Sequence, residues 1–260
     1  MWRYFKAILT FGIRLIFDYF LWINKYSKEK CKASIKKKYQ KIKGLLNSLI
    51  KSLRVDIKVI GKENIPDEVC YFVSNHTSNM DPFCILANID KPIGIVAKKE
   101  VENYPFVGKA LKVMGGVFMD RNDVKQALTQ MLSVREELIM RKKSWLIFPE
   151  GKTNKDRLRL LNTFHPGSFR PAMKAGVPIV PIVVYGTHRI LKLRPVFKSY
   201  PVYVEFLKPI YPDEYKNYST EELAEKTEDM IQRKLSYFGR RYDDEMMSKL
   251  KSKKYKYYQN

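Results

Sequence analysis

The middle of the chain alternates between short apolar runs and longer amphipathic stretches. Apolar and polar residues alternate at Val55–Val59, as in a half-buried strand, and Cys70–Val73 is a continuous apolar run typical of a buried strand. Comparable runs predict strands at residues 93–97, 117–119, 145–148, 177–185 and 202–207. Helical spacing predicts helices at residues 82–89, 105–114 and 123–141, and a last one from Thr220. Strands alternating with helices indicate an α/β domain with a mixed, largely parallel sheet flanked by helices.

The predicted strand at 177–185 contains two prolines, Pro178 and Pro181. Proline has no N–H to donate to a neighbouring strand and is therefore rare in the middle of a sheet. We expect this strand to lie away from a central position.

Residues 2–23 show a different pattern, in which apolar and aromatic side chains fill most positions. The polar residues recur every three or four positions and fall within an arc of about 120° on a helix. They are Arg3, Lys6, Thr10, Arg14 and Asp18. The remaining apolar arc is wider than a face buried on a small domain needs, and its aromatic residues suit the headgroup level of a bilayer.

Two other interpretations of this helix are less favoured. A spanning helix would place Arg14 and Asp18 near the bilayer centre, where charge is costly. A signal peptide would be followed by a cleavage site of small residues, which is absent. We favour a helix that is peripheral or shallowly inserted in the membrane.

Net charge supports that interpretation, because the total of +22 belongs mainly to the two ends of the chain. Residues 1–54 contain 14 basic and 2 acidic residues, residues 233–260 contain 9 and 3, and residues 55–232 contain 26 and 22. Basic ends attract either nucleic acid or an anionic phospholipid bilayer. Because the first helix is largely apolar, we expect the basic ends to bind the bilayer and not nucleic acid.

A second amphipathic helix is predicted to end near Arg54. Its apolar residues, at helical spacing, are Leu45, Leu46, Leu49, Ile50 and Leu53. It packs either on the domain or, with the first helix, on the membrane. We therefore predict membrane-binding helices at 1–54, a globular domain at 55–240 and a basic tail at 241–260.

The three cysteines are odd in number and show no C-x-x-C spacing. This pattern favours a reducing compartment, and hence the cytoplasmic face of the cell membrane, over a disulfide or zinc framework. No spacing of three metal ligands is evident, so metal-free chemistry is expected.

Candidate chemistry begins directly after the strand at 70–73, in the segment Asn75–Asp81. His76 follows the strand, and Pro82 suits the first turn of a helix, so the imidazole is predicted at the sheet edge where ligands bind. Asp81 is near enough for a turn to bring its carboxylate to the imidazole and fix its tautomer. The alternative is a capped turn. No Ser or Cys nucleophile is evident, so the pair would activate a substrate hydroxyl. His165 and His188 lack such a partner and are predicted to be loop residues.

Three further stretches each have a structural explanation when taken alone. Gly116–Arg121 ends a short strand with an arginine, Phe148–Gly151 places a carboxylate beside a turn, and Val177–Pro181 is an apolar strand. Taken together with Asn75–Asp81, in this order and spacing, they resemble the lysophosphatidate (1-acyl-glycerol-3-phosphate) acyltransferase family. The matching motif residues are Asn75, His76, Asp81, Gly116, Arg121, Phe148, Pro149, Glu150, Gly151, Val177, Pro178 and Pro181.

The resemblance implies the glycerolipid acyltransferase fold and transfer of a fatty acyl chain from acyl-CoA or acyl-carrier protein to the sn-2 hydroxyl of lysophosphatidate, giving phosphatidate. No cofactor is implied beyond that co-substrate. His76 would be the general base and Asp81 its orienting partner. Glu150, beside Gly151, could accept a hydrogen bond from a glycerol hydroxyl.

The acceptor's phosphate would be held by Arg121, with Lys152 and Lys98. One position departs from the family pattern, because Thr153 stands where the third motif has an arginine. Lys152 lies next to it, and Arg157 and Arg159 follow. A lysine supplies charge but not the bidentate fork of arginine. The sequence leaves open which basic residue takes this place.

Two alternative functions are carried forward. The acceptor could be glycerol-3-phosphate or another lyso-lipid, because the motifs are shared widely. The chain could also be a non-catalytic basic membrane-binding protein, although its nearly neutral middle and intact His76–Asp81 motif oppose that.

Overall fold

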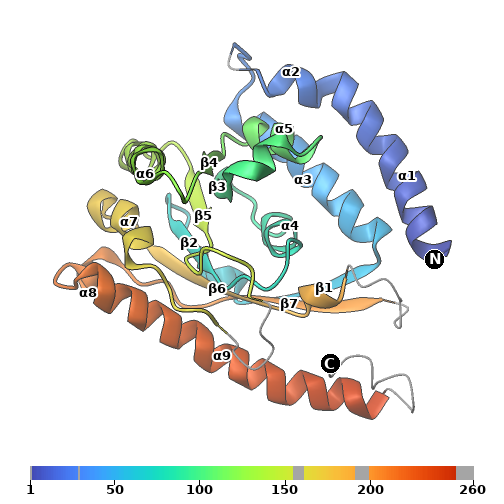
Figure 1. Ribbon diagram of the computed structural model, residues 1–260. Coiled ribbons are helices and arrows are strands. Elements are labelled where there is room, and N and C mark those ends of the chain that lie inside the picture. The colour runs from blue at the N-terminus through green and yellow to red at the C-terminus, as the bar shows by residue number, and fades with distance from the viewer. Residues whose placement is uncertain (1, 29, 155–160, 191–198, 250–260) are drawn as a thin grey trace.

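The computed structural model describes residues 2–28, 30–154, 161–190 and 199–249. Its centre is a seven-stranded sheet with the strand order β1-β7-β6-β2-β5-β3-β4 (Figure 1). All neighbouring strands are parallel except β6 and β7, which are antiparallel. The strands are β1 Val55–Ile60, β2 Tyr71–Ser74, β3 Ile93–Lys98, β4 Val117–Met119, β5 Ser144–Ile147, β6 Ile179–Tyr185 and β7 Tyr200–Phe206. The predicted mixed, largely parallel sheet is confirmed.

Helices connect the strands and cover both faces of the sheet (Figure 1). The α-helices are α1 Trp2–Asp18, α2 Asn24–Tyr26, α3 Ile35–Ser52, α4 Asp81–Leu86, α5 Val107–Val113, α6 Val124–Ile139, α7 Arg170–Ala175, α8 Pro212–Tyr215 and α9 Thr220–Lys249. Shorter turns are the π-helix η1 Tyr19–Ile23 and the 3-10 helices η2 Lys62–Asn64, η3 Lys99–Asn103, η4 Pro166–Phe169 and η5 Thr187–Arg189.

The sheet separates two hydrophobic cores, because successive side chains of a strand point to opposite faces. In β2, Phe72 belongs to the core shared with α3, α4 and α5, whereas Tyr71 and Val73 belong to the core shared with α6, α7 and α9. β2 and β5 are buried on both faces, which explains why they are continuous apolar runs rather than alternating ones.

The expectation that the proline-containing strand avoids a central position is wrong. β6 lies between β7 and β2, in the interior of the sheet. Pro178 precedes the strand, where its carbonyl accepts from Tyr71 N at 2.8 Å. Pro181 lies just beyond the last β6–β7 pair, Ile182–Phe206, and its carbonyl accepts from Leu207 N at 2.9 Å. The missing N–H of Pro181 therefore falls at the end of the β6–β7 ladder and does not interrupt it.

The first helix forms as predicted, continues through η1 and α2, and docks on the domain at its C-terminal end. Trp22 and Ile23 are buried in the core, and the ring of Tyr19 packs edge-on against Phe106 with centroids 5.0 Å apart. Lys109 Nζ, from α5, donates to Asn24 Oδ1 at 2.9 Å. The wide apolar arc therefore has one side that faces the protein.

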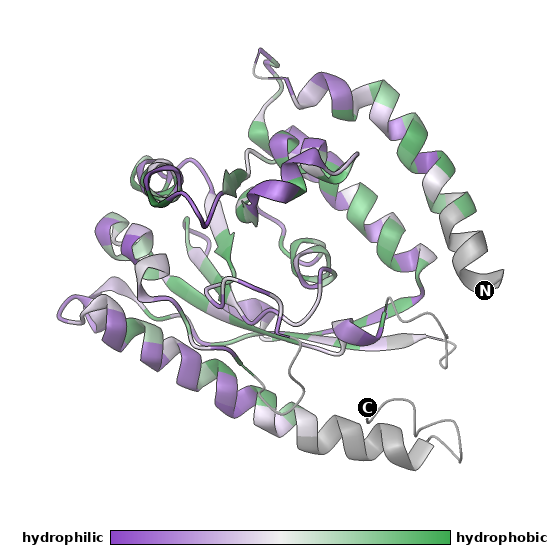
Figure 2. Cartoon of the chain, in the orientation of Figure 1, coloured by the Kyte–Doolittle hydropathy of each residue, from purple (hydrophilic) through white to green (hydrophobic). Residues whose placement is uncertain are grey.

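The opposite side of this helix exposes a row of large apolar side chains at helical spacing. Figure 2 shows α1 along one edge of the molecule, with hydrophobic residues along its described part. The exposed residues are Leu9, Ile13, Ile16, Phe17, Phe20 and Leu21. No helix in the described part of the chain is long and apolar enough to cross a membrane.

The second predicted helix, α3, buries its apolar side in the core beside α4, with Tyr39 Oη donating to the Leu86 carbonyl at 3.0 Å. The boundary predicted at residue 54 therefore does not separate two cores. At the boundary predicted at residue 240, α9 continues without interruption to Lys249. The predicted tail beyond that, residues 250–260, lies outside the described residues.

Candidate active site

Three of the four motif segments end at the carboxyl edge of the sheet, whereas the fourth, Val177–Pro181, lies at the amino-terminal start of β6. β2, β5 and β6 are neighbours in the sheet and run parallel, so the residues that follow their carboxyl ends lie side by side (Figure 1). His76 follows β2, Glu150 follows β5 and Thr187 follows β6. This is the edge where parallel α/β sheets bind ligands.

His76 and Asp81 form the predicted pair. The Nδ1 atom of His76 lies 2.9 Å from Oδ2 of Asp81. The carboxylate is fully buried, whereas the imidazole side chain is 18% exposed. Because a carboxylate accepts hydrogen bonds, Nδ1 carries the proton, and Nε2 is the basic nitrogen on the exposed ring.

Asp81 is held by more than the imidazole. Its Oδ2 also accepts from the backbone amides of Thr77 and Ser78, at 2.6 and 2.8 Å. Its Oδ1 accepts from the hydroxyl of Thr187, a buried residue at the end of β6. The loop thus folds around the carboxylate, so every donor it needs in a buried position is supplied by the protein.

Glu150 connects the third motif to this loop. Its Oε1 accepts from the backbone N–H of His76 at 2.6 Å, and its Oε2 accepts from the amide N–H and side-chain Nδ2 of Asn162, at 2.8 and 2.9 Å. Both oxygens are engaged within the protein, and the side chain is buried. Burial raises the pKa of the Glu150 carboxyl above its ordinary value, and these hydrogen bonds oppose that shift.

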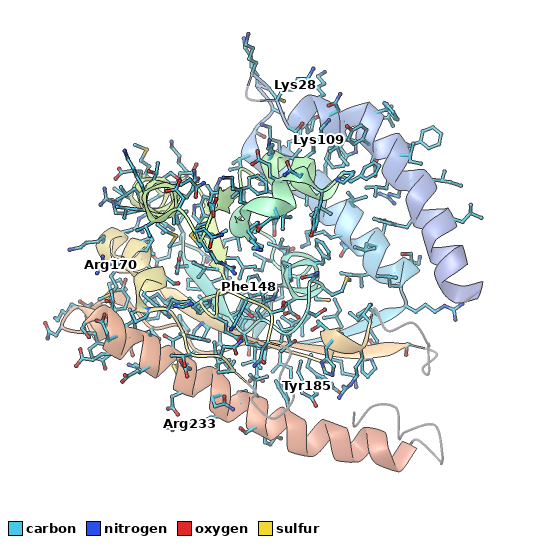
Figure 3. All side chains as sticks on the ribbon, in the orientation of Figure 1. Lys28, Lys109, Phe148, Arg170, Tyr185 and Arg233 are labelled. Atoms are coloured by element: carbon cyan, nitrogen blue, oxygen red, sulfur yellow. The ribbon has the colours of Figure 1, made fainter. Side chains whose placement is uncertain are left out.

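Two further motif residues, Phe148 and Asn75, hold the His76 segment in place. The ring of Phe148 lies against the imidazole with centroids 4.4 Å apart, near the centre of the molecule (Figure 3). Asn75 pairs with both backbone groups of Val184 on β6, donating at 2.9 Å and accepting at 2.8 Å. The backbone N–H of Asn154 donates to the His76 carbonyl at 2.7 Å. His76 is therefore fixed from both neighbouring strands.

The glycines permit close approaches. A Cβ on Gly116 would lie 3.0 Å from the carbonyl oxygen of Ile95, so a side chain there would push β4 from β3. Gly151 adopts a left-handed φ of +70°, and a Cβ on it would lie 3.9 Å from the guanidinium carbon of Arg121. Arg121 therefore reaches from the end of β4 to the third motif.

The two lysines expected to bind the phosphate are both exposed. Lys98 Nζ forms an ion pair with Glu100 Oε1 at 2.6 Å, and both side chains are exposed. Lys152 is exposed. Arg157 and Arg159 lie outside the described residues.

The cysteine nearest the pair is not a competing nucleophile. Cys84 is buried beside Asp81, and burial together with that negative charge raises the pKa of its thiol to about 12. The thiol therefore stays protonated at neutral pH, whereas nucleophilic attack requires the thiolate. Among the described residues, no group of three or more His, Cys, Asp and Glu side chains is arranged to hold a metal ion.

Comparison with known proteins agrees with this geometry. The sequence model of the Acyltransferase family matches residues 56–185, which contain all four motifs. The 1-acyl-sn-glycerol-3-phosphate acyltransferase of Borreliella burgdorferi is 32% identical over 184 residues, which cover 70% of this chain and 72% of that protein. The chain belongs to the 1-acyl-sn-glycerol-3-phosphate acyltransferase family. The family resemblance drawn from the motifs, and with it the assignment to an acyltransferase enzyme class, is confirmed.

Two further members of this acyltransferase family show how far the similarity extends. The Saccharomyces cerevisiae protein of the same name is 29% identical over 188 residues, which cover 72% of this chain and 62% of the yeast protein. The crystal structure of the 1-acyl-sn-glycerophosphate (LPA) acyltransferase PlsC from Thermotoga maritima superposes with a TM-score of 0.70 at 26% identity. The superposition covers 92% of this chain and 94% of the Thermotoga maritima chain.

Sequence reasoning missed three residues of the acyltransferase site. Thr187 and Asn162 hold the carboxylates of Asp81 and Glu150 but lie outside the motifs. His165, expected to be a loop residue without a partner, has its ring beside Gly151. Only Thr187 carried a sequence signal, its place directly after a predicted strand end and a glycine.

Proposed function

We propose that the protein transfers a fatty acyl chain from an acyl thioester to the sn-2 hydroxyl of lysophosphatidate, giving phosphatidate. The observation that carries this proposal is the hydrogen bond between His76 Nδ1 and the buried carboxylate of Asp81, at the ligand-binding edge of an acyltransferase-family fold. The names of the related proteins support lysophosphatidate as the acceptor.

His76 would act as the general base. Its Nε2 would take the proton of the acceptor hydroxyl while the hydroxyl oxygen attacks the thioester carbonyl. As the C–S bond breaks, the imidazolium would return that proton to the departing sulfur. The Asp81 carboxylate would stabilise the imidazolium and hold the ring in one orientation, and general base catalysis of this kind accelerates reactions by about 10²–10⁴-fold.

Arg121 would hold the phosphate of the acceptor, because its guanidinium reaches the third motif and binds phosphate through charge-assisted hydrogen bonds. Glu150 would act differently from the sequence-based hypothesis. Because both of its oxygens already accept N–H groups of the protein, it would position the His76 loop rather than accept a substrate hydroxyl. No cofactor beyond the acyl-CoA or acyl-carrier-protein co-substrate enters this scheme.

The first helix would place the enzyme on an anionic bilayer, at the cytoplasmic face of the cell membrane. The apolar row Leu9–Leu21 is exposed on a helix whose other side is docked on the domain. Nine lysines follow at residues 25–43. Basic residues near an anionic surface contribute about 1 kcal/mol each, in addition to the burial of apolar area. The helix would therefore lie in the headgroup region, with its polar stripe towards water.

The test is an acceptor and donor panel with purified full-length protein. Lysophosphatidate, glycerol-3-phosphate and lysophosphatidylcholine are each offered with acyl-CoA and with acyl-carrier protein, and lipid products are separated. We expect phosphatidate from lysophosphatidate at the highest kcat/KM. A preference for another acceptor would contradict the lysophosphatidate assignment, and the absence of acyl transfer to all three would favour a non-catalytic membrane-binding role.

A further inference from the structure

The third motif lacks the arginine that the resembled family has, so the phosphate subsite proposed around Arg121 needs another partner. Thr153 occupies that position and is a neutral residue. Lys152 is the adjacent cation, and its side chain is exposed. A phosphate monoester carries up to two negative charges, and sites for it combine several charged and N–H donors.

A second histidine lies where such a partner is needed. The Cδ2 and Nε2 atoms of His165 lie 3.1 and 3.2 Å from the point that a Cβ of Gly151 would occupy. The guanidinium carbon of Arg121 lies 3.9 Å from the same point. An imidazole and a guanidinium from distant parts of the chain therefore both lie near the position that a Cβ of residue 151 would occupy.

The backbone around His165 is held on both sides. Its own N–H donates to the carbonyl of Pro149 at 3.0 Å, and the N–H of Ser168 donates to the His165 carbonyl at 3.0 Å. The preceding residue, Phe164, is buried and donates its N–H to Glu228 Oε2 at 2.8 Å. The imidazole is exposed. The loop that carries it is held to the third motif by these backbone hydrogen bonds.

We propose that His165 and Arg121 together bind the phosphate monoester of the acceptor over Gly151, with His165 replacing the missing arginine of the third motif. This rests on the proposed function, because it assumes an acceptor that carries a phosphate. Arg121 offers a bidentate fork, and His165 offers a ring N–H and, when protonated, a second positive charge. A Cβ at 151 would crowd the His165 ring, at 3.1 and 3.2 Å from Cδ2 and Nε2, which accounts for glycine there in addition to its left-handed φ.

The subsite adjoins the catalytic loop. Glu150, the residue before Gly151, accepts the backbone N–H of His76 at 2.6 Å. A phosphate bound over Gly151 is therefore held next to the segment that carries the general base. The hydroxyl and the phosphate of a lysophosphatidate are separated only by the short glycerol backbone, which suits this adjacency.

The test compares His165→Ala and His165→Lys with Lys152→Ala, the competing assignment, and with Thr163→Ala, an exposed position on the same loop. KM and kcat are measured for lysophosphatidate and for the acyl donor, together with competitive inhibition by inorganic phosphate. We expect His165→Ala to raise the KM for lysophosphatidate and the inhibition constant of phosphate about tenfold or more, with kcat and the donor KM within about twofold. His165→Lys should recover most of that loss, and Thr163→Ala should match the wild type.

Three results would overturn the proposal: an unchanged acceptor KM in His165→Ala, a larger effect in Lys152→Ala, or a rise confined to the KM of acyl-CoA, which would assign the site to a phosphate of the donor. Calorimetric binding of inorganic phosphate to the wild type and His165→Ala tests the site without turnover. If the wild type does not acylate lysophosphatidate but binds phosphate through His165, the proposed function fails and the phosphate site stands. Thermal unfolding of each variant identifies those that lose the fold.

Discussion

The loop at residues 75–81 and the helix at residues 2–23 depart from the usual distribution of residues in opposite directions. The loop buries a charged carboxylate, Asp81, whereas the helix exposes large apolar side chains such as Phe20, which is 73% exposed. The carboxylate has all its partners inside the chain, whereas the apolar row stays largely exposed to solvent. A buried carboxylate whose hydrogen bonds are all satisfied beside a histidine suits a catalytic role. A continuous exposed apolar surface indicates that another molecule or a membrane covers it.

The largest expected effect in the loop comes from Asp81→Asn. The amide is similar in shape and can still accept from Thr77 N while donating to Thr187, so the fold should survive. The imidazolium, however, loses its charged partner. We expect kcat to fall by about 10²–10⁴-fold with little change in either KM. A fall of less than tenfold in steady-state assays would mean that the buried carboxylate is structural.

Substitution of Thr187 should lower kcat less than substitution of Asp81. It tests whether the Thr187 hydroxyl positions the His76–Asp81 pair. Thr187→Val keeps the shape but removes the donor to Asp81 Oδ1, leaving a buried oxygen unpaired. We expect kcat to fall about tenfold, on the basis that such a loss costs about 1–3 kcal/mol, whereas Thr187→Ser should retain activity. Equal kcat values in the valine and serine variants would show that the hydroxyl does not position the pair.

The exposed row of the first helix can be removed without touching the site. Replacing Phe17, Phe20 and Leu21 together by asparagine should weaken sedimentation with anionic vesicles about 100-fold or more, because fully burying each such side chain contributes about 1.5–3 kcal/mol. Activity on a short-chain, water-soluble lysophosphatidate should remain. The matched control replaces the exposed apolar residues Val124, Leu128 and Leu132 of α6. An equal loss in that control would place the membrane contact elsewhere.

The smallest effect concerns pH and Glu150. Its pKa is raised in the folded state, so the folded protein holds the proton more readily than the unfolded chain does. The stability contributed by this group is therefore complete below about pH 4.3 and is lost as pH rises through the folded pKa. The free energy of unfolding of the wild type, relative to Glu150→Gln, should decline across that window in urea titrations. A constant difference would contradict the raised pKa.

Much of the loop could be predicted from the sequence because its decisive contact spans five residues. The β2 run, the polar residues after it and Pro82 together indicate a strand, a turn and a helix start, which places His76 and Asp81 together. The first helix was also predicted, because its periodicity is local. The side that docks on α5 was not, since Tyr19 and Lys109 are far apart in the sequence and no local pattern connects them.

The parts that could not be predicted depend on contacts between distant segments. Thr187 reaches Asp81 across 106 residues, and it does so because β6 happens to neighbour β2 in the sheet. His165 reaches Gly151 because a loop tied to α9 through Glu228 returns it there. The placement of the strand with Pro181 fails for the same reason, because no local pattern shows that its missing N–H falls at the end of the β6–β7 ladder.

The most direct test of the account is the rate of acyl transfer to lysophosphatidate by His76→Ala, measured beside Asn79→Ala, an exposed position in the same loop. Both variants are first checked for wild-type thermal unfolding and vesicle binding. The account predicts that His76→Ala loses at least about 100-fold in kcat and that Asn79→Ala stays within about twofold of the wild type. A His76→Ala enzyme that retained more than about a hundredth of wild-type kcat would contradict the general-base assignment.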